Sequence, residues 1–170
     1  MAETAIANNT ANNDNSGGGD GGGLSNDGGT IKIGNSIVAN NLAFGGGNPD
    51  CNSSNPNPLT RLGYELIRDP TGCNFGGTGD TTSGYLSGID PLLGGLASNG
   101  GALANGPPLQ TMALLVGSPA VNAGNPATPT GSGGTCETID QRSRSRSTSP
   151  CDLGAYEAQP ATCARSAAWE

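Results

Sequence analysis

The sequence predicts an all-β solenoid, a chain wound into stacked coils of short strands, followed by a loop-rich C-terminal capping region. Three observations support this: a recurring string, short alternating stretches between Gly and Asn turns, and an unusual composition. Glycine and proline supply 30 and 12 of the 170 residues, whereas bulky aliphatic residues are scarce. That scarcity excludes an ordinary globular core, and the low helix propensity of Gly excludes a helix bundle. Disorder is the alternative, but only 12% of residues are charged, fewer than a disordered chain usually carries.

The recurring string sets the length of one coil. Ile6-Ala-Asn-Asn9 returns as Val38-Ala-Asn-Asn41, 32 residues later. Between the copies, Thr30-Ile-Lys-Ile33 alternates in the way of a strand with one apolar face. Glycine and asparagine suit the corners because they tolerate positive φ, and repeated asparagines can stack their amides from coil to coil. One coil cannot bury its few aliphatic residues alone, but stacked coils share a continuous narrow core.

We expect four segments along the chain. Residues 1–44 form terminal coils that begin in mid-repeat, and residues 45–124 form the loop-rich final coils and a cap with a disulfide. Residues 125–157 form a disulfide-closed loop and a closing strand, and residues 158–170 form a disordered tail.

Three details belong to this layout. The first coil should be open and unpaired at its outer edge. The most apolar stretches, 90–96 and 111–116, should cover an open end of the stack. Residues 12–23 and 125–150, where stacking is interrupted, should be loose.

Five cysteines favour disulfides in a chain with so little core, and therefore an oxidising compartment. Pairing Cys51 with Cys73 would staple a loop-rich coil and stabilise it by on the order of 3 kcal/mol; two free thiols are the alternative. Cys136 and Cys151 would close the following loop. Cys163 is then unpaired, either a free thiol or bonded to a partner outside this chain.

The location that fits these cysteines is extracellular or at a cell surface. The start of the chain lacks the pattern of a signal peptide, and no apolar stretch approaches the length of a membrane span. We therefore interpret the chain as a piece of a longer exported protein.

Missing residue types exclude several chemistries. The chain has no His, which excludes Ser-His-Asp and Cys-His catalysis and His-ligated zinc. Lys32 is the single lysine, and no phosphate-binding loop surrounds it. With 14 acidic and 7 basic residues, we expect no nucleic-acid partner. Arg142, Arg144 and Arg146 predict a solvated loop, with an anion site as the alternative.

Eight short strings, in order along the chain, match a known family. They are Asn35-Ser-Ile-Val-Ala-Asn-Asn41, Leu62-Gly-Tyr-Glu-Leu-Ile67, Gly72-Cys-Asn-Phe75, Asp90-Pro-Leu-Leu-Gly94, Asn99-Gly-Gly101, Gly117-Ser-Pro-Ala-Val-Asn-Ala-Gly124, Asp140-Gln-Arg142 and Cys151-Asp-Leu-Gly-Ala-Tyr-Glu157. On these strings the chain resembles the C-terminal part of bacterial choice-of-anchor Q proteins, which are exported right-handed parallel β-helix proteins.

The resemblance implies a right-handed parallel β-helix whose last coils are sealed by the segment ending in Gly154-Ala-Tyr-Glu157. It also supports the Cys51–Cys73 and Cys136–Cys151 disulfides, and it supplies no catalytic residue. Ser143 stands where the family usually has Gly, and Asn122 where it often has Asp. No sorting tail of the family is recognisable after residue 157.

Calcium is the one ligand that the sequence suggests. Asp14, Asp20 and Asp27 lie in a Gly-rich run, and carboxylate and backbone oxygens are calcium ligands. Acidic residues at solvated turns are the alternative, and no other cofactor is expected.

The predicted function is that of a non-catalytic structural or adhesin-like module, with extracellular polysaccharide or cell-surface components as partners. The alternative is a carbohydrate-binding or polysaccharide-degrading β-helix, of the lyase or hydrolase type. In that alternative Glu65 and Asp90 would face each other across a groove, and Arg61 or Arg68 would be the base of a lyase. Aromatic residues make up 4% of the chain, too few for an evident sugar-binding platform.

Overall fold

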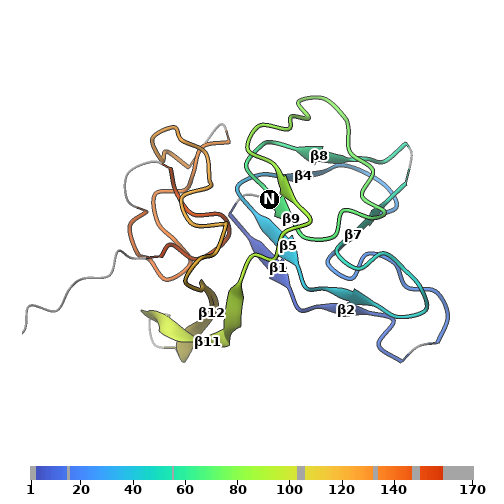
Figure 1. The fold of residues 1–170 in the computed structure, drawn as a ribbon, viewed down its shortest axis with the longest axis horizontal. Helices are drawn as coiled ribbons and strands as arrows, with labels where there is room; N and C mark the ends of the chain where they lie inside the picture. The colour runs from blue at the N-terminus through green and yellow to red at the C-terminus, as the bar shows by residue number, and fades with distance from the viewer. Residues whose placement is uncertain are drawn as a thin grey trace, which may run out of the picture.

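The regular elements in the described part of the chain are β-strands joined by turns and loops, and none of its residues lies in a helix (Figure 1). The computed structural model describes residues 3–14, 16–54, 56–102, 106–131, 134–146 and 150–158. The strands are β1 (Ala5–Ala7), β2 (Thr10–Ala11), β3 (Leu24–Asn26), β4 (Ile31–Ile33), β5 (Ile37–Ala39), β6 (Leu42–Ala43), β7 (Cys51–Ser53), β8 (Leu59–Arg61), β9 (Leu66–Ile67), β10 (Leu86–Ser87), β11 (Leu93–Ala102) and β12 (Pro108–Leu114). The all-β prediction is confirmed. None of these residues belongs to a helix that could cross a membrane.

The first eight strands form two stacked coils. Each strand from β1 to β4 pairs in parallel with the strand four places later. Strand β9 then stacks on β5 and β10 on β9, which gives a sheet in the order β1-β5-β9-β10. Ile6 pairs with Val38, so the repeat in the sequence is the register of the coil. The spacing in sequence between stacked residues, 32 from Ile6 to Val38, shortens to 20 between Ile67 and Ser87.

Asparagines make corresponding corners in the two coils. Asn8 and Asn40, directly after β1 and β5, have φ of 59° and 60°. One residue later, the side-chain oxygen of Asn41 accepts hydrogen bonds from the backbone N–H and the side-chain amide of Asn9, both at 3.0 Å. Stacking of asparagine amides between coils is therefore confirmed at this corner.

The interior of the stack is a narrow aliphatic core. Ile33, Val38, Leu59 and Ile67 are fully buried in one cluster, together with Leu24 and Cys51. The predicted Cys51–Cys73 disulfide lies at this core, with a Cα–Cα distance of 5.2 Å. It ties β7 to the following loop, so the coil is closed covalently where it has few aliphatic residues.

A second apolar cluster lies on the outer face of the same sheet. Ile37 and Leu66 point outward, because successive side chains alternate between the faces of a strand, and they pack with Ala120 and Leu153. We call the described residues of 115–158 the C-terminal module. Its Gly154 N–H donates to the carbonyl of Asn35 at 2.8 Å. The module thus lies beside the coils, as Figure 1 shows, and not across an end of the stack.

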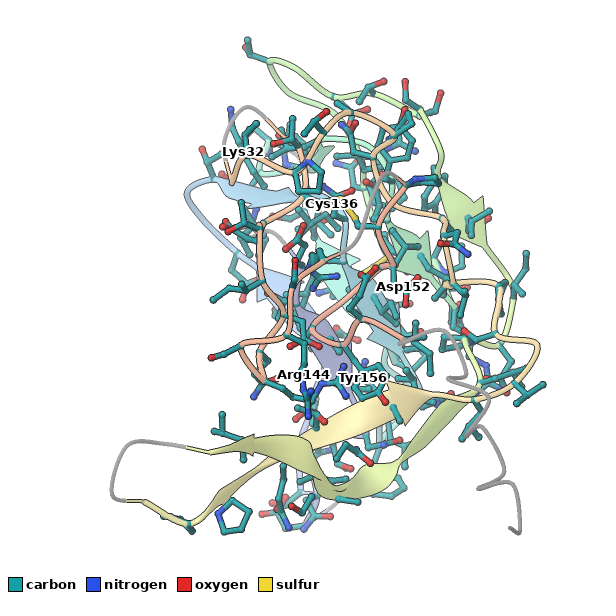
Figure 2. All side chains as sticks on the ribbon, turned by 90° about the vertical axis from the view of Figure 1, so that its left-hand side faces the viewer. Lys32, Cys136, Arg144, Asp152 and Tyr156 are labelled. Atoms are coloured by element: carbon teal, nitrogen blue, oxygen red, sulfur yellow. A yellow bond between two sulfur atoms is a disulfide. The ribbon has the colours of Figure 1, made fainter. Side chains whose placement is uncertain are left out.

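This lateral position corrects the predicted cap. The stretches expected to cover the end of the stack instead form the antiparallel β11–β12 hairpin, which joins the coils to the module. In Figure 2, which looks onto the module, Cys136, Asp152 and Tyr156 lie in front of the coil strands. The physical reason is the apolar outer face, which an end cap would leave in water.

Turns and loops fill the module. The predicted closing strand is not present in its described residues, where Ile139 and Ser145 form an isolated antiparallel bridge. The predicted Cys136–Cys151 disulfide is confirmed, with a Cα–Cα distance of 6.4 Å.

Candidate functional site

Two arginines of the module, Arg142 and Arg146, are bound by buried carboxylates. Asp140 accepts hydrogen bonds from Nε and Nη2 of Arg142 at 2.8 and 2.6 Å. It also accepts the backbone N–H groups of Arg144 and Glu157 at 3.0 and 3.1 Å. Burial alone would raise the pKa of Asp140, but these hydrogen bonds outweigh it and hold the pKa below its usual value. The Arg142 guanidinium stacks on the ring of Tyr156 at 3.6 Å.

Arg146 connects the module to the beginning of the coil stack. Its Nε lies 3.2 Å from a Glu3 oxygen, and its Nη1 lies 3.0 Å from a Glu157 oxygen. Its Nη2 donates to the Gly154 carbonyl at 2.7 Å. Burial raises the pKa of both Glu3 and Glu157, and the charge of Arg146 opposes that rise. We call Glu3, Arg146 and Glu157 the buried ionic cluster.

The solvated loop predicted for the three arginines is therefore wrong for two of them. Arg142 and Arg146 are 6% and 5% exposed, and Arg144 alone is exposed. Their anions are carboxylates of the same chain, so these two arginines do not form an open anion site. The prediction that residues 125–150 are loose is wrong for the part around these two arginines, where Asp140, Arg142 and Arg146 are buried; residues 132–133 and 147–149 of that range lie outside the described residues. The sequence offered no signal for this cluster, because Glu3 lies more than a hundred residues from Arg146.

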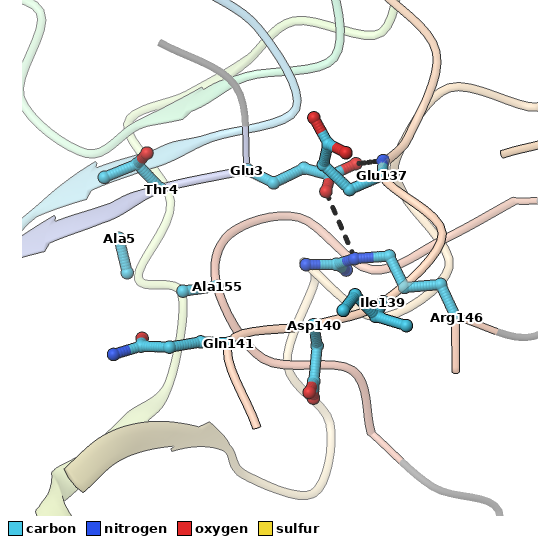
Figure 3. Close-up of a pocket in the computed structure, with 9 residues that line it drawn as sticks. All are labelled: Glu3, Thr4, Ala5, Glu137, Ile139, Asp140, Gln141, Arg146 and Ala155. Atoms are coloured by element: carbon cyan, nitrogen blue, oxygen red, sulfur yellow. Dashed lines mark hydrogen bonds and ion pairs between the residues drawn. The ribbon is translucent and has the colours of Figure 1, made fainter. Parts of the chain in front are cut away.

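A groove lies beside this cluster. It has a volume of about 520 Å³ and separates the start of β1 from the module (Figure 3). Its lining residues are Glu3, Thr4, Ala5, Glu137, Ile139, Asp140, Gln141, Arg146 and Ala155. In Figure 3 the Glu3 side chain reaches from the coil to the backbone N–H of Glu137 and to Arg146.

A lone carboxyl group is buried inside the coils. Glu65 is fully buried, and neither of its side-chain oxygens has a hydrogen-bond partner among the described residues. Burial raises its pKa to about 8, although Arg61 opposes the rise. Arg61 itself is paired with Asp80 at 2.7 Å and lies 4.3 Å from the Phe75 ring centroid. Glu65 is therefore protonated at neutral pH.

The residues considered for carbohydrate chemistry are not brought together. The Glu65 carboxyl is enclosed, whereas the Asp90 side chain is 49% exposed and lies 3.8 Å from Arg68. A pair that attacks a sugar must share one groove, so Glu65 and Asp90 cannot act in that way. Arg61 is engaged with Asp80, and Arg68 is engaged with Asp90 and Asn40.

Two of the three calcium candidates accept backbone N–H groups through their carboxylates. Asp14 accepts the Ser16 N–H at 3.1 Å, and Asp20 accepts the Asn48 N–H at 3.1 Å. Asp27 is exposed after β3. Across the residues the structure describes, these three carboxylates do not form a cluster with the spacing of metal ligands. Calcium binding by them stays a prediction.

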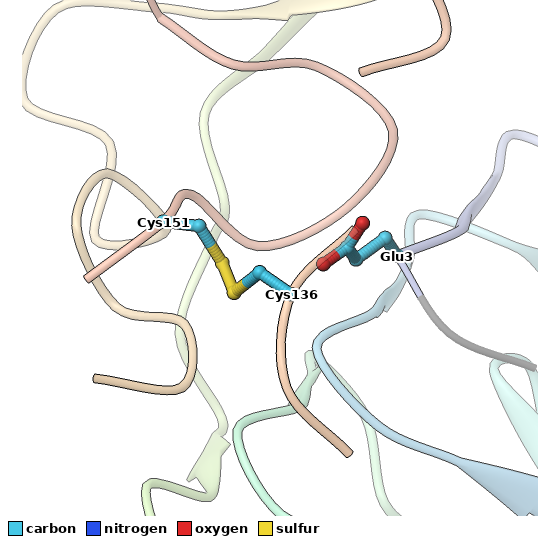
Figure 4. A group of neighbouring side chains, drawn as sticks. All are labelled: Glu3, Cys136 and Cys151. Atoms are coloured by element: carbon cyan, nitrogen blue, oxygen red, sulfur yellow. A yellow bond between two sulfur atoms is a disulfide. The ribbon is translucent and has the colours of Figure 1, made fainter. Parts of the chain in front are cut away.

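One group in the described residues does have metal-like spacing, namely Glu3, Cys136 and Cys151 (Figure 4). The two cysteines are bonded to each other, and a disulfide is not the thiolate that a metal requires. The group is therefore the contact of a disulfide with the buried ionic cluster. Cys163, the predicted unpaired cysteine, lies outside the described residues.

Comparisons with known proteins leave the family open. No family profile matches the chain, and no curated protein or solved structure matches it. The resemblance to choice-of-anchor Q proteins thus stays a prediction that rests on the eight strings.

Proposed function

We propose that the chain is a non-catalytic structural or adhesin-like module of an exported or cell-surface protein, built as a right-handed parallel β-helix. Stacking of parallel strands around a narrow aliphatic core, closed by a disulfide, supports this most directly. Right-handedness is the general preference of parallel crossovers and agrees with the family resemblance. The two disulfides are compatible with an extracellular location.

The charged groups in the described interior favour a structural role. Arg142 is bound by Asp140, Arg146 by Glu3 and Glu157, and Arg61 by Asp80. Such groups hold segments together and are not free to bind or attack a substrate. Glu65 is the exception, and its enclosure keeps it away from any large substrate. No observation favours the polysaccharide-degrading alternative.

An activity and binding screen tests this proposal. The oxidised chain is incubated with polyuronates and with neutral polysaccharides, and new reducing ends are measured beside a heat-denatured control. We expect no new reducing ends, while insoluble polysaccharide or whole bacterial cells retain the folded chain. Reducing ends formed by the folded chain and absent with the Asp90→Asn variant would overturn the non-catalytic proposal.

A further inference from the structure

A pocket lies at the corner of the second and third coils, directly after β5 and β9. It has a volume of about 350 Å³, and Asn40, Leu42 and Arg68 are among its lining residues. The register of β5 and β9 gives the third coil Arg68 and Asp69 where the second coil has Ala39 and Asn40. None of the described residues that line the pocket belongs to the first coil, so the pocket does not depend on what precedes β1.

The pocket carries negative charge that no described cation balances. Asp50, which lines it, is 1% exposed and accepts the backbone N–H groups of Asn41 and Asp69 at 3.0 and 2.8 Å. One oxygen of Asp69 accepts the Thr71 N–H at 3.0 Å, and the other has no hydrogen-bond partner among the described residues. Neither carboxylate forms an ion pair with another described residue. Because buried charges in proteins are usually paired, the pocket favours a cationic ligand.

Arg68 lies at the pocket but is directed to other partners. Its Nη1 donates to the side-chain oxygen of Asn40, and its Nη2 lies 3.8 Å from Asp90. The guanidinium therefore leaves the charge of Asp69 unmatched. It also fixes the Asn40 side chain, whose amide nitrogen has no hydrogen-bond partner among the described residues. This nitrogen is a donor that a ligand hydroxyl can use.

Part of the pocket wall is apolar. Leu42 and Pro49 line it, and Leu42 is 52% exposed. The volume lies in the range of small-ligand pockets, in which apolar surface surrounds a few polar groups that fix the orientation. Asp50 and Asp69 do not belong to the one group of described residues with metal-like spacing. The C–H face of a sugar ring fits the apolar wall, and a protonated amine on that ring fits the carboxylates.

We propose that this pocket binds an amino sugar residue of an extracellular polysaccharide. The protonated amine of the sugar lies at the Asp69 carboxylate, the ring packs against Leu42, and a ring hydroxyl accepts a hydrogen bond from Asn40. The assignment rests on the proposed adhesin-like role and goes further, because it locates the binding site and names the class of sugar.

Isothermal titration calorimetry of the full oxidised chain tests the proposal. The probe is a hexamer of β-1,4-linked glucosamine at mildly acidic pH, where its amines are protonated. We expect saturable binding that weakens with salt. The fully N-acetylated hexamer is the matched control, since it has the same rings and linkages without the positive charge. It should bind about tenfold less tightly, as the loss of a charge-assisted hydrogen bond implies.

Three protein variants locate the binding. Asp69→Asn keeps an oxygen for the Thr71 N–H and removes the charge, so the glucosamine hexamer should bind about tenfold less tightly. Asp14→Asn makes the same change of net charge at a turn outside the pocket and should bind as the native chain does. Leu42→Ser, at an exposed position, should weaken both hexamers, because both rings lose the apolar contact.

Four results would overturn the proposal. The first is the absence of saturable binding by the glucosamine hexamer. The second is equal binding of the hexamer by the Asp69→Asn and Asp14→Asn variants. The third is binding of a hexalysine peptide at least as tightly as the hexamer, lost in Asp69→Asn, because the occupant would then be a basic protein segment. The fourth is heat with calcium chloride alone that Asp69→Asn abolishes, because the pocket would then be a metal site.

Retention on whole bacterial cells separates this proposal from the adhesin-like role. If cells retain the native chain and Asp69→Asn equally well, adhesion stands and this pocket is not its site. If cells and insoluble polysaccharides do not retain the native chain, the adhesin-like role fails, whatever the hexamer does in solution. Weaker retention of Asp69→Asn than of Asp14→Asn would support both proposals.

Discussion

At the scale of single residues, Glu65 places an ionisable side chain in a fully buried position inside the coils. Its pKa is raised to about 8 by burial, from an ordinary value near 4.5. Between these two values the folded protein keeps a proton that the unfolded chain releases. Rising pH therefore favours the unfolded chain over this range, and the contribution of Glu65 to stability is lost as pH rises toward the folded pKa.

We predict that Glu65→Gln removes this pH dependence. The native chain should lose about 1.4 kcal/mol of unfolding free energy per pH unit through Glu65, between about pH 5 and pH 8. The Gln amide resembles the protonated carboxyl but has no proton to release. Urea denaturation across this range measures the slope for each protein. Glu137→Gln, at an exposed position, is the control and should keep the native slope; equal slopes for Glu65→Gln and the native chain would contradict the prediction.

At the scale of the coil, two neighbouring asparagines at one corner, Asn40 and Asn41, stabilise the coil in different ways. Asn40 supplies a positive φ of 60°, which Gly adopts without strain. Asn41 is 3% exposed and connects the coils: it binds Asn9, and its side-chain amide donates to the Ile6 carbonyl at 3.0 Å and to Asp50 at 2.9 Å. The first role depends on the backbone, with one exposed hydrogen bond from Arg68 to the Asn40 side chain beside it, and the second depends on the side chain.

Substitutions at the two positions should therefore differ in cost. We predict that Asn41→Ala lowers the free energy of unfolding by about 2 kcal/mol, because it removes a hydrogen bond to the buried Asp50 carboxylate and bonds to the partly buried Asn9 N–H and Ile6 carbonyl. Asn40→Gly should change it by less than about 1 kcal/mol. Guanidinium denaturation of both variants gives the comparison, and a similar loss at the two positions would contradict the prediction that the Asn41 side chain connects the coils.

Repetition also explains which parts of the coil could be predicted from the sequence. The Ile6–Val38 register follows from a repeated string, because equivalent residues of stacked coils must meet at the coil period. The Cys51–Cys73 and Cys136–Cys151 bonds join residues close in sequence. A signal for the lateral module was present in Ile37-Val38, since adjacent apolar residues in a strand indicate that both faces are covered.

At the scale of the whole molecule, the attachment of the module to the coils depends on contacts that do not repeat. Leu153 fits against the outer row of Ile37 and Leu66, and Arg146 reaches Glu3 from the other end of the chain. Neither contact has a fixed spacing, so no pattern in one sequence reveals it. The solvated loop that the sequence predicts for Arg142, Arg144 and Arg146 differs from the structure for the same reason, because charge within a short string says nothing about the carboxylates that the fold brings to it.

The charge of Arg146 in the buried ionic cluster should contribute strongly to the stability of the protein. Arg146→Met removes the charge shared by Glu3 and Glu157 and leaves two carboxylates in a buried site, which typically costs about 3–5 kcal/mol. We therefore predict a lower denaturation midpoint for Arg146→Met at neutral pH. Arg144→Met, two residues away and exposed, should stay within about 0.5 kcal/mol of the native chain.

Acidification distinguishes loss of charge from loss of packing in the Arg146→Met variant. Glu3 and Glu157 already have pKa values raised by burial, and removing Arg146 takes away the charge that opposes this rise. Protonation then neutralises both carboxylates in the folded variant, so its deficit against the native chain should shrink as pH falls toward about 5. Denaturation at neutral and mildly acidic pH measures the deficit. A deficit that stays constant would mean that the guanidinium holds the module by its shape and its hydrogen bond to Gly154, and not by its charge.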